Sequence, residues 1–340
     1  MRLINISLLF LLLSTFTAAG EEDGKKETEV DLIPKIHGAF RSRFESEFES
    51  GINRFQVRNA RISVNGMVAP SIDYFIQIDA SDRGKMKFLD AYGRIAITDN
   101  FKFQAGQFRE PFGVEVTRAP ANYVFANRAF LGKEVCNIRG VGAKMSFNLK
   151  DIPLLFEAGA FNTTGIADHS VENKLIAFAS KILWTPDKWT FATGFMSQAP
   201  YGKRVSLYDI TVGWKNKEWE FLGEAIAKTY THSSLDPACA YAVWGQRMFP
   251  VSWGVFNQAS VQARFDGLTA HSNGSVDEEG KFILTDAARN RVTLGGTVTY
   301  KYKMVHADVR LNYEKYFYHS GAAIAAGADD KIVAELVIRF

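Results

Sequence analysis

Apolar and polar residues alternate with a period of two over most of the chain. In the clearest stretch, residues 36–48, Phe40 and Phe44 fall on one face of an extended strand. Arg41 and Glu45 fall on the opposite face, because successive side chains of a strand point to opposite sides. The pattern therefore predicts a chain of β-strands that each have one apolar face and one polar face.

The alternation predicts sixteen strands. Most of the runs are 9 to 13 residues long. A strand that crosses a membrane at a tilt needs about 9–11 residues, so these runs have a suitable length. The strands are expected at residues 36–48, 54–68, 72–80, 88–97, 101–108, 139–147, 154–162, 175–184, 189–197, 205–214, 219–229, 239–249, 254–265, 290–300, 304–315 and 331–340.

The connections between these strands alternate between short and long. Residues 98–100 and 301–303 are short joins, and Pro250-Val251-Ser252 is expected to be another. Residues 109–138 and 266–289 are long joins. Short turns on one rim and long loops on the other are typical of outer-membrane barrels, whereas a soluble sandwich has no reason to sort its loops. We therefore predict an all-β fold: a closed transmembrane antiparallel β-barrel of sixteen strands, located in the cell outer membrane.

Tryptophans cluster beside the tight turns. Indole rings favour the interface between membrane and water, so these positions predict an aromatic girdle at one rim. The alternative, that these rings lie in a soluble core, fits positions next to turns poorly. The residues are Trp184, Trp189, Trp214, Trp219 and Trp253.

The N-terminus has the pattern of a secretory signal. Arg2 precedes an apolar run from Leu3 to Phe16, and small residues follow at positions 17–20. The run is shorter than the ~20 residues that a membrane-spanning helix needs, which disfavours the alternative of an anchoring helix. We predict a signal peptide at 1–20, a flexible periplasmic tail at 21–35 and the barrel at 36–340.

Composition narrows the chemistry. The 40 Lys and Arg residues and 37 Asp and Glu residues give a formal charge of +3, which does not favour a nucleic-acid partner. Two cysteines, Cys136 and Cys239, exclude a Cys-rich metal site and leave open whether they form one disulfide or stay as two thiols. The sequence carries no nucleophile elbow, zinc-protease motif or phosphate-binding glycine loop. We expect no enzymatic activity, no cofactor and no metal.

The connection 109–138 is far longer than an ordinary loop, and such loops are usually functional. It carries aromatic residues that would be poorly placed in external water. We expect it to fold into the lumen, pack these rings on the inner wall and form the narrowest point of the pore. Its cations, Arg109, Arg118, Arg128 and Lys133, are opposed by three glutamates, and its aromatic residues are Phe112, Tyr123, Phe125 and Phe130.

The chain resembles the phosphate-selective porin O and P family over about residues 36–340. The resemblance rests on residues 60–66, on Asp90-Ala91-Tyr92, and above all on residues 106–115, Gly-Gln-Phe-Arg-Glu-Pro-Phe-Gly-Val-Glu. It implies a sixteen-stranded barrel that assembles as a homotrimer, with the long third loop inside and basic residues along the pore. It also implies that phosphate or a related anion passes through.

An anion channel needs fixed positive charge in a narrow lumen. Carboxylates such as Glu45 and Asp266 share the inward face, so two outcomes stay open: the cations attract anions, or they pair with these acids and leave little net field. The cations that we expect to line the pore are Arg41, Arg43, Arg61, Arg94, Arg109, Arg118, Arg128, Lys133, Lys144, Arg264 and Arg310.

The sequence thus predicts an outer-membrane porin for passive diffusion of small anions such as phosphate or polyphosphate. One alternative is a weakly selective porin for small hydrophilic solutes, and another is a barrel with a structural or docking role. The expected partners are small anionic or hydrophilic solutes, outer-membrane lipid and two further copies of the chain.

Overall fold

The computed structural model describes residues 30–82, 85–136, 139–149, 151–163, 165–166, 175–318 and 328–340. The predicted signal peptide at 1–20 and the first part of the predicted tail lie outside these residues, so both stay predictions. The described chain forms sixteen strands and two short helical turns.

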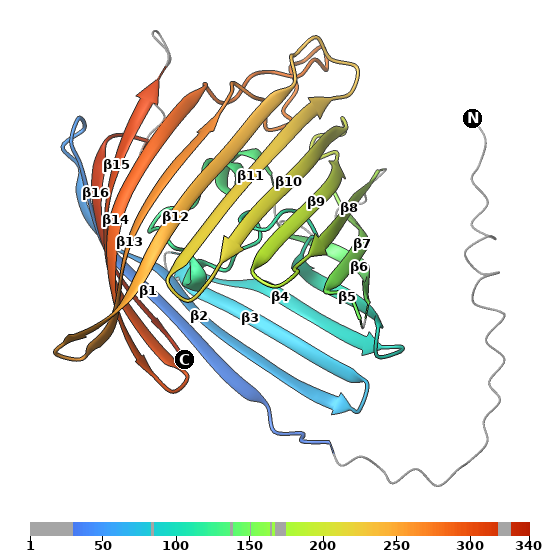
Figure 1. Ribbon diagram of the computed structural model, residues 1–340. Coiled ribbons are helices and arrows are strands. Elements are labelled where there is room, and N and C mark those ends of the chain that lie inside the picture. The colour runs from blue at the N-terminus through green and yellow to red at the C-terminus, as the bar shows by residue number, and fades with distance from the viewer. Residues whose placement is uncertain are drawn as a thin grey trace, which may run out of the picture.

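The strands close into one barrel (Figure 1). Each strand pairs antiparallel with its neighbours in sequence, and β1 closes the barrel on β16, where Phe40 pairs with Ile338. This confirms the predicted fold. The strands are β1 Lys35–Glu47, β2 Asn53–Ala69, β3 Ile72–Asp82, β4 Lys85–Ala96, β5 Phe101–Arg109, β6 Arg139–Asn148, β7 Leu154–Asn162, β8 Ile176–Trp184, β9 Trp189–Gln198, β10 Val205–Lys215, β11 Trp219–Tyr230, β12 Ala238–Trp253, β13 Phe256–Leu268, β14 Arg289–Tyr302, β15 Val305–Tyr318 and β16 Lys331–Arg339.

The two faces of the wall follow the alternation in the sequence. Phe40, Ile76 and Val309 are exposed on the outside, where lipid would cover them, whereas Arg41 and Arg310 are almost completely buried on the inside. Because a closed barrel pairs every strand, it satisfies its backbone hydrogen bonds without water. Within the described residues, no helix is long and apolar enough to cross a membrane.

The two rims differ as the sequence predicts (Figure 1). Both ends of the described chain lie at the lower rim in that view, which we call the short-turn rim. The opposite end, which we call the long-loop rim, carries long connections such as residues 269–288 between β13 and β14.

One turn lies a few residues from its predicted place. The expected turn at Pro250-Val251-Ser252 is wrong: β12 continues to Trp253, and the turn is Gly254-Val255. Gly254 has a φ of +59°, a conformation that glycine adopts without steric cost. Pro250 lies where the β12–β13 register shifts, and a proline is tolerated at such a bulge because it has no N–H to donate.

Candidate pore and the inner loop

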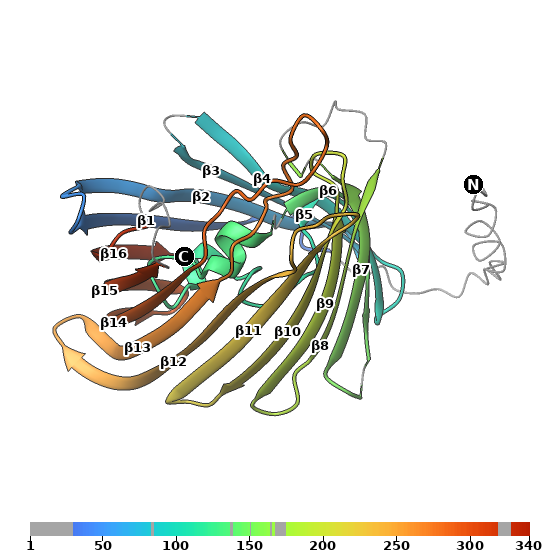
Figure 2. The same ribbon diagram turned by 90° about the horizontal axis from the view of Figure 1, so that it is seen from above.

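The connection between β5 and β6 runs inside the barrel (Figures 1 and 2). We call its described part, residues 110–136, the inner loop. It contains a short 3₁₀ turn, η1 (Pro120–Asn122), and a π-helical turn, η2 (Leu131–Val135). The prediction that this connection folds into the lumen is therefore confirmed.

Apolar side chains fix the inner loop to the wall. Phe112 and Leu131 are fully buried. Phe125 packs edge-on against Trp244 of β12, with ring centroids 6.3 Å apart, and Phe130 packs against Tyr316 of β15. Burying such rings provides the main driving force for keeping the loop inside.

A loop buried in this way needs partners for its backbone N–H groups. One carboxylate of the wall, Glu224 on β11, accepts three of them: those of Val114 at 2.9 Å, Glu115 at 2.6 Å and Val116 at 3.3 Å. Two further N–H groups donate to wall side chains, that of Ala126 to Asn312 and that of Phe130 to Asp266. The wall thus presents acceptors where the loop presents donors.

Arginines of the wall donate to the loop's carbonyl groups in the same manner. Arg41 of β1 donates to the carbonyl of Ala126 at 2.7 Å. Arg264 of β13 donates to the carbonyl of Asn127 at 2.8 Å, and Arg291 of β14 to that of Arg128 at 2.7 Å. These arginines therefore hold the loop in place.

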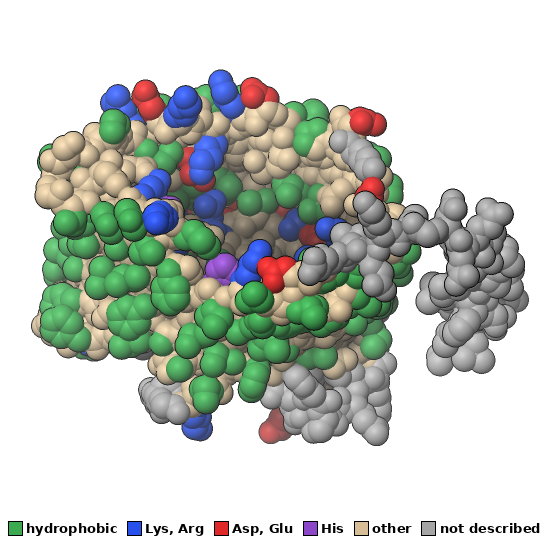
Figure 3. All heavy atoms as spheres, turned by 90° about the horizontal axis from the view of Figure 1, so that it is seen from below, with side chains coloured by type: hydrophobic (Ala, Val, Ile, Leu, Met, Phe, Trp, Pro, Cys, Tyr) green, Lys and Arg blue, Asp and Glu red, His purple; other side chains and the backbone are tan. Residues whose placement is uncertain are grey.

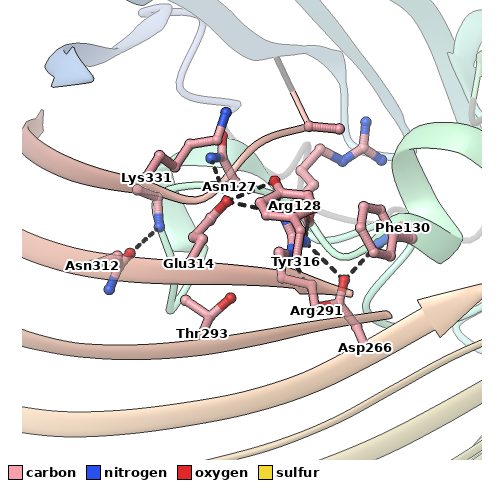
Figure 4. Close-up of polar contacts among 12 residues, drawn as sticks. Asn127, Arg128, Phe130, Asp266, Arg291, Thr293, Asn312, Glu314, Tyr316 and Lys331 are labelled. Atoms are coloured by element: carbon pink, nitrogen blue, oxygen red, sulfur yellow. Dashed lines mark hydrogen bonds and ion pairs between the residues drawn. The ribbon is translucent and has the colours of Figure 1, made fainter. Parts of the chain in front are cut away.

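A buried ionic network lies beneath this attachment (Figure 4). Arg291 contacts Asp266 at 2.7 Å and Glu314 at 3.2 Å, and all three side chains are nearly inaccessible to solvent. The Tyr316 hydroxyl donates to Glu314 at 2.9 Å, and the Phe130 ring lies 4.4 Å from the guanidinium of Arg291. Each buried charge has an opposite charge and hydrogen bonds beside it, which it needs to be stable away from water.

A cavity of about 620 Å³ lies between the inner loop and strands β1–β4. We call it the first cavity. Glu45 and Arg54 at its edge lie next to the β1–β2 connection, so it faces the long-loop rim. Its lining contains eleven Lys or Arg residues and two acidic ones, Glu45 and Asp79, so it is strongly basic.

Three guanidinium groups in the first cavity lack a carboxylate partner among the described residues. Arg109 donates to the carbonyl of Thr117, and Arg128 donates to that of Val116. The guanidinium of Arg58 on β2 has neither an ion pair nor a hydrogen bond within the described chain. The charge of these groups is available to a solute.

Arg58 was not among the cations predicted to line the pore, because it lies at a β-bulge. Arg41 pairs with Asn59, whereas Ser42 pairs with Val57, which leaves Arg58 as an extra residue on β2. A bulge lets two adjacent residues point to the same side, which strict alternation does not predict. The run Arg54, Arg58 and Arg61 within one strand was the only signal in the sequence.

A second cavity, of about 390 Å³, lies on the other side of the loop residue Tyr123. Its lining includes Lys215, Lys301 and Arg339, which stand near the ends of β10, β14 and β16, so it faces the short-turn rim. Figure 3 views the barrel from this rim and shows Lys and Arg side chains around a hollow. Tyr123 lines both cavities, with the Arg41 guanidinium 5.3 Å from its ring.

The structure distributes the predicted pore residues among different surroundings. Arg41, Arg43, Arg61, Arg109 and Arg128 line the first cavity. Arg118 and Arg310 line the second. The others meet acids of the wall: Arg94 contacts Asp73, Lys144 contacts Glu157, and Arg264 contacts Asp266 and lies in neither cavity. The side chain of Lys133 lies outside the described residues.

The two cysteines are not joined. Cys136 and Cys239 are both free thiols, so of the two possibilities that the sequence leaves open the structure has the unbridged one. No group of three or more His, Cys, Asp or Glu side chains in the described part of the chain could hold a metal ion.

The burial of Glu110, the first residue of the inner loop, should make the stability of the protein depend on pH. Burial raises its pKa to about 7 from a usual 4.5, and a hydrogen bond from Gln198 at 3.3 Å opposes this rise. Between pH 4.5 and about 7, the folded state therefore keeps the proton on Glu110, whereas the unfolded state has released it. The stabilisation is fully present below pH 4.5 and lost as the pH rises to about 7, on the order of 3 kcal/mol in total.

The measurement is the free energy of unfolding in detergent between pH 4 and 8, for the wild type and for Glu110→Gln. Because glutamine cannot titrate, the variant should lose this part of the decline and be the more stable protein at pH 8. Parallel pH profiles for the two proteins would contradict the assignment.

Residues 46–338 match the model of a family described as "Putative beta-barrel porin-2, OmpL-like". No curated protein matches the sequence.

Solved structures share the fold at low sequence identity. The anion-selective porin from Comamonas acidovorans aligns with a TM-score of 0.64 at 9% identity, over 90% of this chain and 98% of that one. OmpT of Vibrio cholerae, in its trimer form, gives 0.60 at 12% identity, over 91% and 98%. Salmonella typhi OmpF, in complex with daunomycin, gives 0.62 at 11% identity, over 90% and 97%.

Proposed function

Because this chain belongs to the OmpL-like β-barrel porin-2 family, we propose that it is an outer-membrane porin whose pore favours small anions such as phosphate or polyphosphate. The barrel, the porin family and the outer-membrane location are the premises. Porins are channels, and we retain the expectation that this chain is not an enzyme. The choice of anions as the preferred solutes is the proposal.

The observation that carries the proposal is a set of cations in the first cavity that have no carboxylate partner within the described part of the chain. Arg58, Arg109 and Arg128 stand where a solute from the long-loop rim would meet the inner loop. A guanidinium group matches a phosphate or carboxylate with two parallel hydrogen bonds. Partial removal of water in a narrow site strengthens each such charge.

A weakly selective porin for small hydrophilic solutes is the second candidate, and a specific observation favours it. Several wall cations are neutralised: Arg41 and Arg310 both contact Glu335, and Arg139 contacts Asp90 at 2.9 Å. Paired charges of this kind leave little net field. The reversal potential across a salt gradient separates the two candidates. Only an anion-favouring pore gives a reversal potential close to the equilibrium potential of the anion.

Removing two of the unpaired charges should reduce the preference for anions. In Arg58→Gln with Arg128→Gln, the ratio of anion to cation permeability should fall by roughly fivefold or more. One unit charge a few ångströms away is worth about 1 kcal/mol even in bulk water, which corresponds to that factor. The measurement is the reversal potential of single channels in a KCl gradient.

Lys188→Gln serves as the matched control, since Lys188 is an exposed cation in a short turn between β8 and β9. It should leave the reversal potential unchanged. If the double variant keeps the wild-type potential, these arginines do not determine the selectivity.

We also propose assembly as a homotrimer. The support is that OmpT of Vibrio cholerae, which shares the fold, is described in a trimer form. Native electrophoresis before and after heating should show a band of three chains that converts to one, and a single heat-insensitive monomer band would contradict the proposal.

A further inference from the structure

The second cavity has a lining unlike that of the first. Apart from Tyr123, six of its side chains are uncharged hydrogen-bonding groups, one from the inner loop and five from strands β12–β14. We call these residues the polar wall. They are Asn122, Gln246, Gln258, Ser260, Thr297 and Thr299.

Much of the hydrogen-bonding capacity of the polar wall is unused within the described chain. The Gln258 side chain makes no hydrogen bond there, although it is only partly exposed. Gln246 donates to Glu220 at 2.9 Å and keeps its carbonyl oxygen free. Ser260 donates to Gln262 at 3.3 Å, which leaves its oxygen lone pairs available. The wall therefore offers both donors and acceptors to a guest.

Cations stand beside this wall in the same cavity. Lys301 is exposed and has no ion-pair partner in the described part of the chain. Arg339 donates to the Asn122 side chain at 3.1 Å and lies 3.7 Å from Asp308. Arg118 contacts Glu115 at 2.8 Å and lies 3.7 Å from Glu220. Five cations and two carboxylates, Glu220 and Asp308, line the cavity, which thus combines an excess of positive charge with neutral groups that bind hydroxyls.

We propose that the second cavity is a binding site for small anions that carry several hydroxyl groups, with monosaccharide phosphates as the class that fits best. The inference rests on the proposed anion preference and names the solute more closely. Bare phosphate would use the cations and leave the polar wall solvated. A neutral sugar would use the wall and leave the cations solvated. A sugar phosphate engages both.

The size of the cavity and its position support the same class. A volume of about 390 Å³ falls in the range of small-molecule sites. The ring of Tyr123 is almost completely buried, so it does not offer a face on which a nucleobase could stack. A solute that has passed the first cavity and Tyr123 reaches this wall before it leaves at the short-turn rim.

The test is the block of chloride current through single channels by inorganic phosphate, glucose and glucose 6-phosphate, each added at equal ionic strength. Glucose 6-phosphate should half-block at a concentration roughly tenfold below that of phosphate, because two additional hydrogen bonds contribute about that factor. Glucose alone should have little effect. Equal half-blocking concentrations for the two phosphates would overturn the inference.

The double variant Gln258→Leu with Ser260→Ala should bring the glucose 6-phosphate value to that of phosphate and leave phosphate itself unchanged. Gln56→Leu, the same kind of change in the first cavity, is the control and should keep the tenfold ratio. If the double variant retains the ratio, the polar wall is not the site.

These outcomes are distinct from failure of the proposed function. If the wild-type reversal potential is not that of an anion-favouring pore, the anion preference itself is wrong. If the potential favours anions and only the tenfold ratio is missing, the anion preference stands and the sugar-phosphate site does not. Heat-modifiable migration of each variant on gels confirms that its barrel is folded.

Discussion

Replacing Arg291 by methionine is expected to lower the free energy of unfolding by about 3–5 kcal/mol, the usual cost of removing one partner from a buried ion pair. Arg291 is 2% exposed, while Asp266 and Glu314 are fully buried, so solvent cannot replace the lost guanidinium. Asp266 keeps Arg264 at 3.2 Å, and the main cost falls on Glu314. The change also removes the donor to the carbonyl of Arg128 and so weakens the attachment of the inner loop. Urea titration in detergent, followed by tryptophan fluorescence, measures the effect.

Arg94→Met is the matched control. Arg94 contacts Asp73 at 3.0 Å, but both side chains are about one third exposed. Exposed pairs contribute about 0–1 kcal/mol, so this variant should stay close to the wild type. If the two variants lose the same stability, the network around Arg291 is not the anchor that its geometry indicates.

Glu224→Ala should release the first half of the inner loop. The variant removes the acceptor of three backbone N–H groups, and each buried N–H left without an acceptor costs about 1–3 kcal/mol. The free energy of unfolding should therefore fall by at least about 3 kcal/mol. In single-channel recordings, we expect larger and fluctuating conductance, because residues 113–118 would no longer keep one position in the lumen.

Glu220→Ala controls for the lost negative charge. Glu220 lies on the same strand and also faces inward, but among the described residues its carboxylate contacts only the side chains of Lys215, Gln246 and Arg118. This variant should have steady conductance, and the loss of a negative charge from the second cavity should increase its preference for anions. If the Glu224→Ala channel is equally steady, the loop does not depend on Glu224.

The alternation of apolar and polar residues and the lengths of the loops were sufficient to predict the fold from the sequence. Phe40 beside Arg41 assigns the two faces of β1, because a strand exposes successive residues on opposite sides. The closed barrel follows from sixteen such runs, since a membrane strand needs a partner on both edges. The long connection after β5 was also recognisable, because its aromatic residues require burial.

Regular alternation could not show where the pattern breaks. The turn at Gly254 and the bulge at Arg58 are local choices of backbone conformation. Each one changes which residue faces the lumen without changing the composition of the strand. Arg58 therefore entered the candidate site only through the register of β1 against β2.

The role of each inward cation was decided by tertiary structure alone. Arg41 and Arg264 on the wall and Arg128 in the long connection are all expected from the sequence to line the pore. In the folded chain, Arg41 and Arg264 donate to carbonyls of the inner loop, while Arg128 faces the first cavity and has no carboxylate partner among the described residues. Strand alternation gives the side of the wall on which a charge lies. The partner of that charge depends on where a distant loop places its backbone, which no local pattern specifies.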